Sequence, residues 1–266
     1  MNRSTGENSA AHGLEGAAGL QGASILKPEM TIIGFGKIGK RFTEVFSAGF
    51  DVGVISGRDI AAEAGELGAR RIDNWEEAVA SSNYILLAVP LHALAPVIRR
   101  INPHVGPKAW AFDMCSARVS AGKEMASLKC RWFGIHAGYV IGEAPDEILR
   151  YLSGKGYDLL PVTAEDHDAR NSIVAMVQFI GMTVDALLTE SERRYLEEKS
   201  PASVNLLKLI DHLKGNAPAT YWESQLRNGY SKSQRHRLIQ ALEAYSDKLD
   251  RGFFPFSEKL YDVKMD

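Results

Sequence analysis

The sequence lacks the features that define several large classes of protein. It has only two cysteines, Cys115 and Cys130, in 266 residues, which excludes a disulfide scaffold and a four-cysteine zinc site. No apolar run approaches the ~20 residues of a membrane span. Neither sign of charge dominates, because 31 Lys and Arg face 33 Asp and Glu, for a net charge of −2. We therefore expect a cytoplasmic protein whose partners include no nucleic acid and no membrane.

Signatures of hydrolases and metalloenzymes are also missing. No serine lies in a G-x-S-x-G pattern, and the seven histidines form no H-E-x-x-H or H-x-H pattern, so we expect no metal site. Residues 34–40 do read G-x-x-x-x-G-K, but Arg41 follows where a P-loop needs the Ser or Thr that binds magnesium. This departure excludes a P-loop nucleoside triphosphatase.

The composition and its changes along the chain predict three segments. Residues 1–27 are rich in Gly, Ala and Ser and are predicted to be a disordered tail. In residues 28–163, continuous apolar strands alternate with helices, which indicates an α/β fold with a doubly wound parallel sheet that binds a dinucleotide. Residues 164–266 have helical periodicity and predict an all-α C-terminal domain for substrate binding and dimerisation.

The strongest single motif is GFGKIG at residues 34–39. It follows an apolar strand at 30–33 and precedes a segment with helical spacing, which is the setting that dinucleotide binding requires. Gly34 permits the tight turn, Gly36 allows the backbone to approach a pyrophosphate, and Gly39 allows the helix to pack on the strand. The predicted cofactor contacts in this motif are Gly34, Phe35, Gly36, Lys37, Ile38 and Gly39.

The residues after the second predicted strand, 50–55, indicate which dinucleotide is bound. NAD-binding chains place an acidic residue about 20 residues after the glycine motif, to hold the ribose hydroxyls. Here Ser56 occupies that place and Arg58 follows two residues later. A hydroxyl and a guanidinium suit a 2′-phosphate, so we favour NADP. NAD stays open, because Asp59 is close enough in sequence to bind the ribose.

Further candidates follow the later strands, predicted at 84–89, 110–112 and 132–135. Ligands bind beyond the carboxyl ends of parallel strands, so Val89, Pro90 and Asp113 are predicted cofactor contacts. Ser116 and His136 are the predicted catalytic residues, since a histidine beside a nicotinamide can accept a proton from a substrate hydroxyl. Alternatively, His136 is a structural residue and Ser116 is a helix cap. Cys115 is either a reactive thiol or a buried apolar filler.

These motifs together resemble the prephenate/arogenate dehydrogenase family. The resemblance rests on GFGKIG, LLAVP at 86–90, Asp113-x-x-Ser116, the Gly-x-His136 segment and the helical sequence from residue 200 to 249. It implies NAD(P)-dependent oxidation of the ring hydroxyl of prephenate or arogenate, with decarboxylation and aromatisation. His136 is implied to contact the ring hydroxyl and Ser116 to lie between hydroxyl and nicotinamide. The family resemblance also implies a homodimer and an alicyclic carboxylic acid as substrate.

The chain departs from the family pattern at the proposed substrate site. Family members usually continue Val-Lys after the serine and Pro-Met after the histidine, whereas this chain has Ala117-Arg118 and Ala137-Gly138. His212 stands where a family arginine binds the substrate carboxylate, and imidazole is a poorer anion ligand than guanidinium. These departures indicate an altered substrate, such as an amino-substituted prephenate. The candidate substrate contacts are His212, Arg194 and Tyr139, with Arg193, Arg227, Arg235 and Arg237 as further arginines.

Two other functions remain open from the sequence. One is an NADP-dependent reductase of an imine or ketone in specialised metabolism, and the other is a nucleotide-sensing protein without turnover.

The helices predicted for the C-terminal part span 166–180, 190–198, 204–213, 219–225 and 232–249, with a short strand-like run at 184–188.

Overall fold

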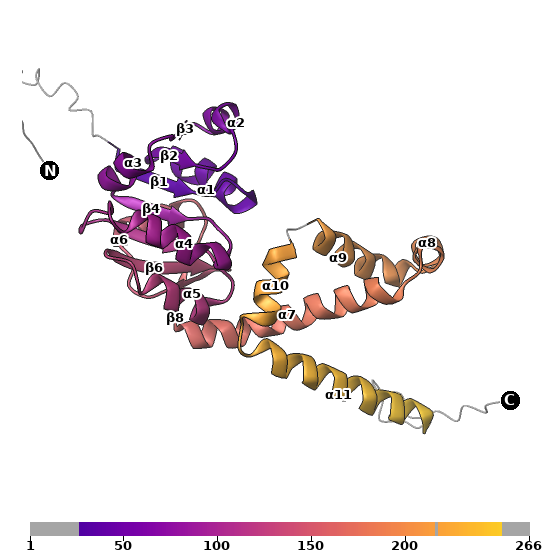
Figure 1. Cartoon of the computed structure of the whole chain (residues 1–266). Helices are drawn as coiled ribbons and strands as arrows, with labels where there is room; N and C mark the ends of the chain where they lie inside the picture. The colour runs from indigo at the N-terminus through magenta and orange to yellow at the C-terminus, as the bar shows by residue number, and fades with distance from the viewer. Residues whose placement is uncertain (1–26, 216–217, 252–266) are drawn as a thin grey trace, which may run out of the picture.

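The computed structural model describes residues 27–215 and 218–251, and the side chains at 202 and 218–220 are outside that description. The predicted tail therefore lies outside the described residues, apart from Lys27. The described chain forms a sheet with helices on both faces, followed by an extended group of helices (Figure 1).

All eight strands form one sheet, in the order β3-β2-β1-β4-β5-β6-β7-β8. Neighbouring strands are parallel except for β6 and β7, which pair antiparallel. The chain order reverses between β1 and β4, which is where doubly wound folds bind ligands. The strands are β1 (Glu29–Ile33), β2 (Asp51–Ile55), β3 (Arg70–Arg71), β4 (Tyr84–Leu87), β5 (Trp110–Asp113), β6 (Arg131–His136), β7 (Tyr139–Ile141) and β8 (Leu160–Val162).

Two apolar cores cover the two faces of the sheet, because successive strand residues point to opposite sides. One core joins Ile32 and Phe112 to α1, α2 and α6, and the other joins Ile33 and Ile85 to α3, α4 and α5. The predicted fold class is thereby confirmed. The helices of this part are α1 (Lys37–Ser47), α2 (Ala61–Glu66), α3 (Trp75–Ser81), α4 (Leu91–Ile101), α5 (Arg118–Met125) and α6 (Asp146–Gly154).

A two-residue turn joins β6 to β7 directly after His136. Its central residues, Ala137 and Gly138, have φ of 49° and 83°, and His136 pairs with Tyr139 across the hairpin. Two positive φ values are typical of the type I′ turn that fits the twist of a hairpin. Proline cannot adopt φ of this sign, so the departure from the family's His-Pro sequence has a structural reason in this chain.

The C-terminal part is built around α7 (Ala164–Leu187), which contacts α5 of the sheet domain as well as α9, α10 and α11. Figure 1 shows α7 leading away from the sheet, whereas α11 starts beside it and diverges towards the C-terminal end. Gly181 allows close packing here, since a Cβ at this position would lie 2.6 Å from Leu213 Cδ1. The other elements are α8 (Glu190–Lys199), the 3-10 turn η1 (Pro201–Ser203), α9 (Val204–Lys214), α10 (Pro218–Leu226) and α11 (Ser231–Asp250).

The prediction of a strand-like run at 184–188 was wrong, because α7 continues through Leu187 and Leu188 is its C-cap. Val184 is the only β-branched residue of this run, and Asp185, Ala186 and Leu187 continue the helix beyond it. Among the described helices, none alone is long and apolar enough to span a membrane. The pair α7 and α8 reaches the required length and composition together, but the two helices are bent by 114°.

Candidate active site

The glycine turn between β1 and α1 has the geometry expected of a dinucleotide site. Gly34 has φ of +106°, and a Cβ there would lie 2.4 Å from the Ala88 carbonyl oxygen. A Cβ on Gly39 would lie 2.1 Å from the Gly34 carbonyl oxygen, so α1 packs directly against the turn. A Cβ on Gly36 would meet nothing within 4 Å. The turn is therefore tight on its protein side and open in front of the α1 N-terminus, where free amides favour a phosphate.

The other residues of the motif divide between core and surface. The Phe35 side chain is buried in the core, and its carbonyl oxygen accepts a hydrogen bond from Arg58 Nη2 at 3.3 Å. Ile38 is 44% exposed on the first turn of α1, where Lys37 also lies. An exposed isoleucine beside an open glycine turn gives a bound dinucleotide an apolar surface to contact.

The predicted 2′-phosphate residues lie in a cluster of opposite charges after β2. Arg58 Nη1 donates to Glu63 Oε1 at 2.8 Å, and Lys40 pairs with the other oxygen of the same carboxylate. The hydrogen bonds from Lys40 and Arg58 hold the pKa of Glu63 below its usual value. Ser56 Oγ accepts a long hydrogen bond of 3.4 Å from the Arg58 amide. Asp59, the alternative ribose ligand, pairs with Arg71 at 2.6 Å.

The loops that follow β4 and β5 lie side by side at the edge where the chain order reverses. Val89 Cγ1 would lie 3.1 Å from a Cβ on Gly34, and the Val89 carbonyl accepts a weak 3.7 Å contact from Cys115 Sγ. Burial raises the pKa of the Cys115 thiol, which favours the buried filler over the reactive thiol. Pro90 is the N-cap of α4, and Leu91 N donates to Glu223 Oε1 of α10 at 2.6 Å.

Asp113 is completely buried at the end of β5, where it forms an ion pair with Arg118. Arg118 Nη2 donates to Asp113 Oδ2 at 2.8 Å, and Nη1 donates to Oδ1 and to the Cys115 carbonyl. The guanidinium lies against Gly134 of β6, where a Cβ would come within 1.6 Å of Nη2. Asp113 therefore shapes the loop that carries Ser116, and its predicted contact with the cofactor stays a prediction.

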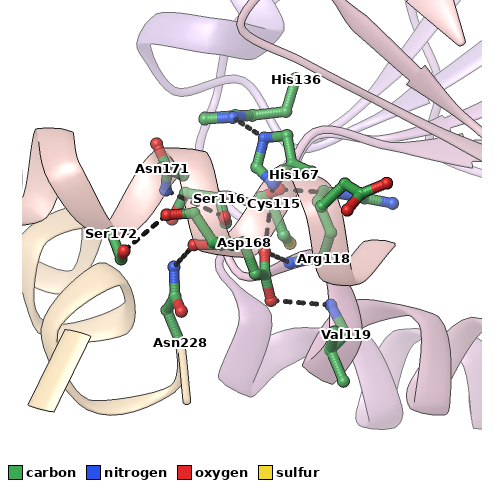
Figure 2. Close-up of polar contacts among 12 residues, drawn as sticks. Cys115, Ser116, Arg118, Val119, His136, His167, Asp168, Asn171, Ser172 and Asn228 are labelled. Carbon is green, nitrogen blue, oxygen red and sulfur yellow. Dashed lines mark hydrogen bonds and ion pairs between the residues drawn. The ribbon is translucent and has the colours of Figure 1, made fainter. Parts of the chain in front are cut away.

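His136 ends β6 and forms a hydrogen-bonded chain with two residues of α7 (Figure 2). His136 Nδ1 lies 2.9 Å from His167 Nε2, and His167 Nδ1 lies 3.1 Å from Asp168 Oδ1. His167 and Asp168 are both 1% exposed. Burial, the adjacent His167 and the Arg118 guanidinium lower the pKa of His136 to about 4. His136 is therefore neutral at physiological pH, the form in which imidazole accepts a proton.

Ser116 lies on the loop between β5 and α5, close to this chain of residues (Figure 2). Its hydroxyl is buried and makes no hydrogen bond within the described part of the chain. Asn171 Nδ2 of α7 donates to its carbonyl oxygen at 3.2 Å. Ser116 is not the cap of α5, because Ala117 occupies the N-cap position. A buried hydroxyl without a partner at this place is suited to a hydrogen bond with a ligand.

Of the three predicted substrate residues, only Tyr139 lies near His136. Its ring centroid is 5.8 Å from that of His167, and its hydroxyl accepts a hydrogen bond from Arg170 Nη1 at 3.3 Å. His212 and Arg194 are exposed on α9 and α8, along the half of α7 that lies away from the sheet (Figure 1). Within one chain, the structure does not bring these two residues to His136.

Several residues of the site were not predicted from the sequence. His167, Asp168, Arg170 and Asn171 all come from the first two turns of α7, and Glu223 comes from α10. The only local signal was the segment HDARN at 167–171, which is unusually polar for a helix that must pack on a sheet domain. Among the described residues, no group of three His, Cys, Asp or Glu side chains has the geometry to hold a metal ion.

Comparisons with known proteins agree with this architecture. The family model described as "NADP oxidoreductase coenzyme F420-dependent" matches residues 29–108, which run from β1 to just beyond α4. A curated Methanocaldococcus jannaschii chain, described as "Probable arogenate/prephenate dehydrogenase", is 23% identical over 80% of this chain and 54% of its own length. The present chain thus spans about half the length of the curated relative it matches.

Two solved structures share most of this architecture. Prephenate dehydrogenase from Aquifex aeolicus, in complex with hydroxyphenyl propionate and NAD+, has a TM-score of 0.63 at 13% identity, and the match covers 86% of this chain and 91% of the other. Synechocystis arogenate dehydrogenase has a TM-score of 0.60 at 15% identity and covers 84% and 91%. The fold is that of the prephenate and arogenate dehydrogenases.

This result confirms the resemblance expected from the sequence and gives the site its frame. In this fold the glycine turn, the serine loop and the end of the histidine strand all lie at the carboxyl edge of the sheet. The identities of 13–23% also agree with the expected divergence, which the sequence locates at the residues after Ser116 and His136.

Proposed function

We propose that the chain is an NADP-dependent dehydrogenase that oxidises a ring hydroxyl of an alicyclic carboxylic acid of the prephenate or arogenate type, with decarboxylation and aromatisation. The observation that carries the proposal is the meeting of three features at the carboxyl edge of the sheet. These are the open glycine turn, the unpartnered Ser116 hydroxyl and the neutral, half-buried His136. The similarity to arogenate/prephenate dehydrogenases supports the substrate class.

The residues present fit a nicotinamide dinucleotide. The space in front of Gly36 is open where a side chain would stand, and no acidic residue lies in the first turn of α1 to repel a phosphate. The amides of the glycine turn and the α1 N-terminus would hold the pyrophosphate, and Val89 and Pro90 would flank the cofactor. When bound, the nicotinamide supplies the acceptor for a hydride.

In this proposal His136 accepts the proton of the ring hydroxyl as the carbon-bound hydrogen leaves as hydride. The O–H bond breaks, a bond forms between that proton and the imidazole, and the hydroxyl carbon becomes a carbonyl carbon. Loss of the ring carboxylate as carbon dioxide then moves the electron pair of the broken C–C bond through the ring to the carbonyl oxygen, and this oxygen takes the proton back from His136 to give an aromatic phenol. Ser116 donates or accepts a hydrogen bond at the same oxygen and fixes its position.

Recognition of the substrate carboxylate falls to Tyr139 and Arg170 in this proposal. Arg170 is exposed at the edge of the site, and its guanidinium already contacts the Tyr139 hydroxyl. A guanidinium binds a carboxylate through two parallel hydrogen bonds. The contacts predicted for His212 and Arg194 stay predictions.

The test measures NADP+ reduction by absorbance with prephenate, arogenate and an amino-substituted prephenate, for the full chain and for His136→Asn. Asparagine occupies similar space but cannot accept the proton, so we expect kcat to fall by ~10²–10⁴-fold. The dissociation constant of NADP+ should change by less than about twofold, since the cofactor contacts lie elsewhere. Unchanged turnover in this variant would contradict the role of His136.

The same assay separates the alternatives. Oxidation of NADPH with an imine or ketone, without activity on the three acids, would instead identify a reductase. Tight binding of NADP+ without turnover in either direction would identify a nucleotide-sensing protein.

We also propose that the chain forms a homodimer through its helical part. Exposed apolar residues recur on one face of α11 at intervals of three to four residues, and α11 diverges from the other helices (Figure 1). An apolar cavity of about 450 Å³ also opens between α7, α9 and α10. We propose that a second copy of this chain packs against the apolar face of the long helix α11. The exposed residues are Ile239, Leu242, Tyr245 and Leu249 on α11, and Ile173, Val174 and Val177 on α7.

A further inference from the structure

The hydrogen bonds that link His136, His167 and Asp168 determine which nitrogens of the two imidazole rings carry a proton. Asp168 Oδ1 lies 3.1 Å from His167 Nδ1, and a carboxylate can only accept, so His167 Nδ1 carries the proton. In a neutral His167, Nε2 is then the acceptor in its 2.9 Å contact with His136 Nδ1. His136 Nδ1 must therefore carry a proton, and in the neutral ring Nε2 is left without one.

The carboxylate at the end of the chain is itself held by several hydrogen bonds. Asp168 Oδ1 accepts from Arg118 N at 2.7 Å and Oδ2 accepts from Val119 N at 3.0 Å. These are the first amides of α5, which has no side-chain cap of its own. Asn228 donates to the Asp168 carbonyl at 2.8 Å. A carboxylate on two amides at a helix N-terminus is stabilised in its charged, accepting form.

We propose that His167 and Asp168 are positioning residues that hold His136 in the neutral tautomer with Nε2 free to accept a proton. The inference rests on the proposed function, in which His136 takes the hydroxyl proton. That proton binds Nε2, and the resulting imidazolium keeps its Nδ1 hydrogen bond to His167, whose own Nδ1 proton stays on His167 and is donated to Asp168. No proton needs to move along the chain. Residues with this role in other enzymes work in the same way, by fixing the tautomer and stabilising the imidazolium.

The other charged and titratable groups around His136 are consistent with this arrangement. Arg118 of α5 disfavours a charged His136, whereas Asp113 of β5 and Asp168 of α7 favour it. Tyr139 of β7 lies against His167 but makes its hydrogen bond with Arg170. Apart from His167, none of these groups makes a hydrogen bond to His136 among the interactions of the described chain.

The first experiment reads the tautomer without any substrate. Two-bond ¹H–¹⁵N correlation spectra of the full chain at neutral pH distinguish a ring nitrogen that carries a proton from one that does not. We expect His136 to have a protonated Nδ1 and an unprotonated Nε2, and His167→Leu to shift His136 to a mixture of tautomers. His104→Gln, which removes a distant histidine near Glu76, is the matched control and should leave the His136 signals unchanged.

The second experiment measures kinetics with whichever substrate is turned over. His167→Leu should lower kcat by ~10²-fold with KM within about threefold, and should move the acidic limb of the pH profile. His167→Gln can still accept a hydrogen bond from His136 and donate one to Asp168. The kcat of this variant should therefore be at least about a third of that of the unaltered chain.

The outcomes separate this inference from the proposed function. An Nε2-protonated His136 in the unaltered chain, or a His167→Leu variant with the original tautomer and kcat, would overturn the positioning role. If His167→Leu fails to fold, the spectrum of the unaltered chain and the Gln variant still decide. If His136 has the expected tautomer but none of the three acids is turned over, the proposed function is refuted and the positioning role is not.

Discussion

At the scale of single residues, Glu63 is expected to affect how tightly the proposed cofactor site binds a 2′-phosphate. Its carboxylate pairs with both Arg58, the predicted 2′-phosphate residue, and Lys40 of α1. A 2′-phosphate would make its own charge-assisted hydrogen bonds to Arg58 and would compete with Glu63 for that guanidinium. A cofactor without that phosphate leaves the pair intact. Glu63 is therefore expected to lower the preference for NADP that Arg58 creates.

This competition predicts opposite effects of two substitutions on NADP binding. Arg58→Ala should weaken NADP+ binding by ~10-fold or more, because it removes a charged phosphate ligand. Glu63→Gln should tighten NADP+ binding by ~3–10-fold, because Arg58 and Lys40 are freed. NAD+ binding should change by less than about twofold in both. Titration calorimetry with each cofactor measures these effects.

Arg70→Ala serves as the control, since Arg70 pairs with Asp51 rather than with this cluster or with Asp59. Equal losses for NAD+ and NADP+ in the Arg58 variant would rule out a 2′-phosphate contact there.

The sequence predicted local backbone geometry where it follows directly from a motif, and the cofactor contacts of the motif residues stay predictions. Gly34, Gly36 and Gly39 have the environments that their spacing predicts. His167 could not be found in this way, because it lies 31 residues from His136 and reaches it only through the packing of α7 on α5. His212 was assigned by alignment alone, and α9 places it away from the sheet (Figure 1).

At the scale of elements, the contact between β6 and the loop before α5 depends on a glycine. Gly134 leaves the space in which the Arg118 guanidinium lies, and Arg118 neutralises the fully buried Asp113. A side chain at position 134 would displace the guanidinium from its partner. A buried carboxylate that loses its partner is costly, at ~3–5 kcal/mol in comparable cases.

We therefore predict that Gly134→Ala lowers the free energy of unfolding by about 3 kcal/mol or more. Urea unfolding followed by circular dichroism measures the effect. Gly154→Ala is the matched control, because Gly154 ends α6 and a Cβ there meets nothing within 4 Å. That variant should be unchanged or more stable by ~0.5–1 kcal/mol. A Gly134→Ala protein as stable as the control would show that Arg118 can be displaced at little cost.

Some elements were absent from the sequence-based description for physical reasons. Strand β7 has three residues and β3 has two, so neither is long enough to show an alternating pattern. The hairpin that forms β7 depends on Ala137 with positive φ, a conformation that alanine rarely adopts and that its sequence does not indicate. By contrast β1, β4 and α4 have continuous or periodic apolar patterns that identify them without further information.

At the scale of the whole molecule, the apolar face of α11 is the feature that needs a partner. Leu242→Glu together with Tyr245→Glu would place two charges in the proposed dimer interface, where their desolvation is costly. We expect the unaltered chain to have a dimer mass in light scattering and the double variant to have a monomer mass. Leu160→Glu is the control, because Leu160 is 61% exposed on β8, outside the α7–α11 surface. A concentration-independent monomer in the unaltered chain would refute the homodimer.

The overall fold was predictable because its two parts carry different periodicities. Continuous apolar strands with a glycine turn indicated the doubly wound sheet, and long helical repeats indicated the C-terminal helices. How the parts meet was not predictable, because Asp168, Asn171 and Glu223 join them through a few side-chain hydrogen bonds to backbone atoms. Such contacts leave no periodic trace in a sequence.

The position of α7 determines when the proposed active site has its full set of residues in place. This helix, about 36 Å long at 1.5 Å per residue, carries His167 and Asp168 near one end and packs against α9 in the half that lies away from the sheet. His136, in contrast, belongs to the sheet. The hydrogen bond between His136 and His167 exists only while α7 is packed on the sheet domain. Neither part of the chain alone therefore holds both His136 and the residues that fix its tautomer. Undocking α7 by even one hydrogen-bond length would switch off the tautomer control without touching the cofactor turn.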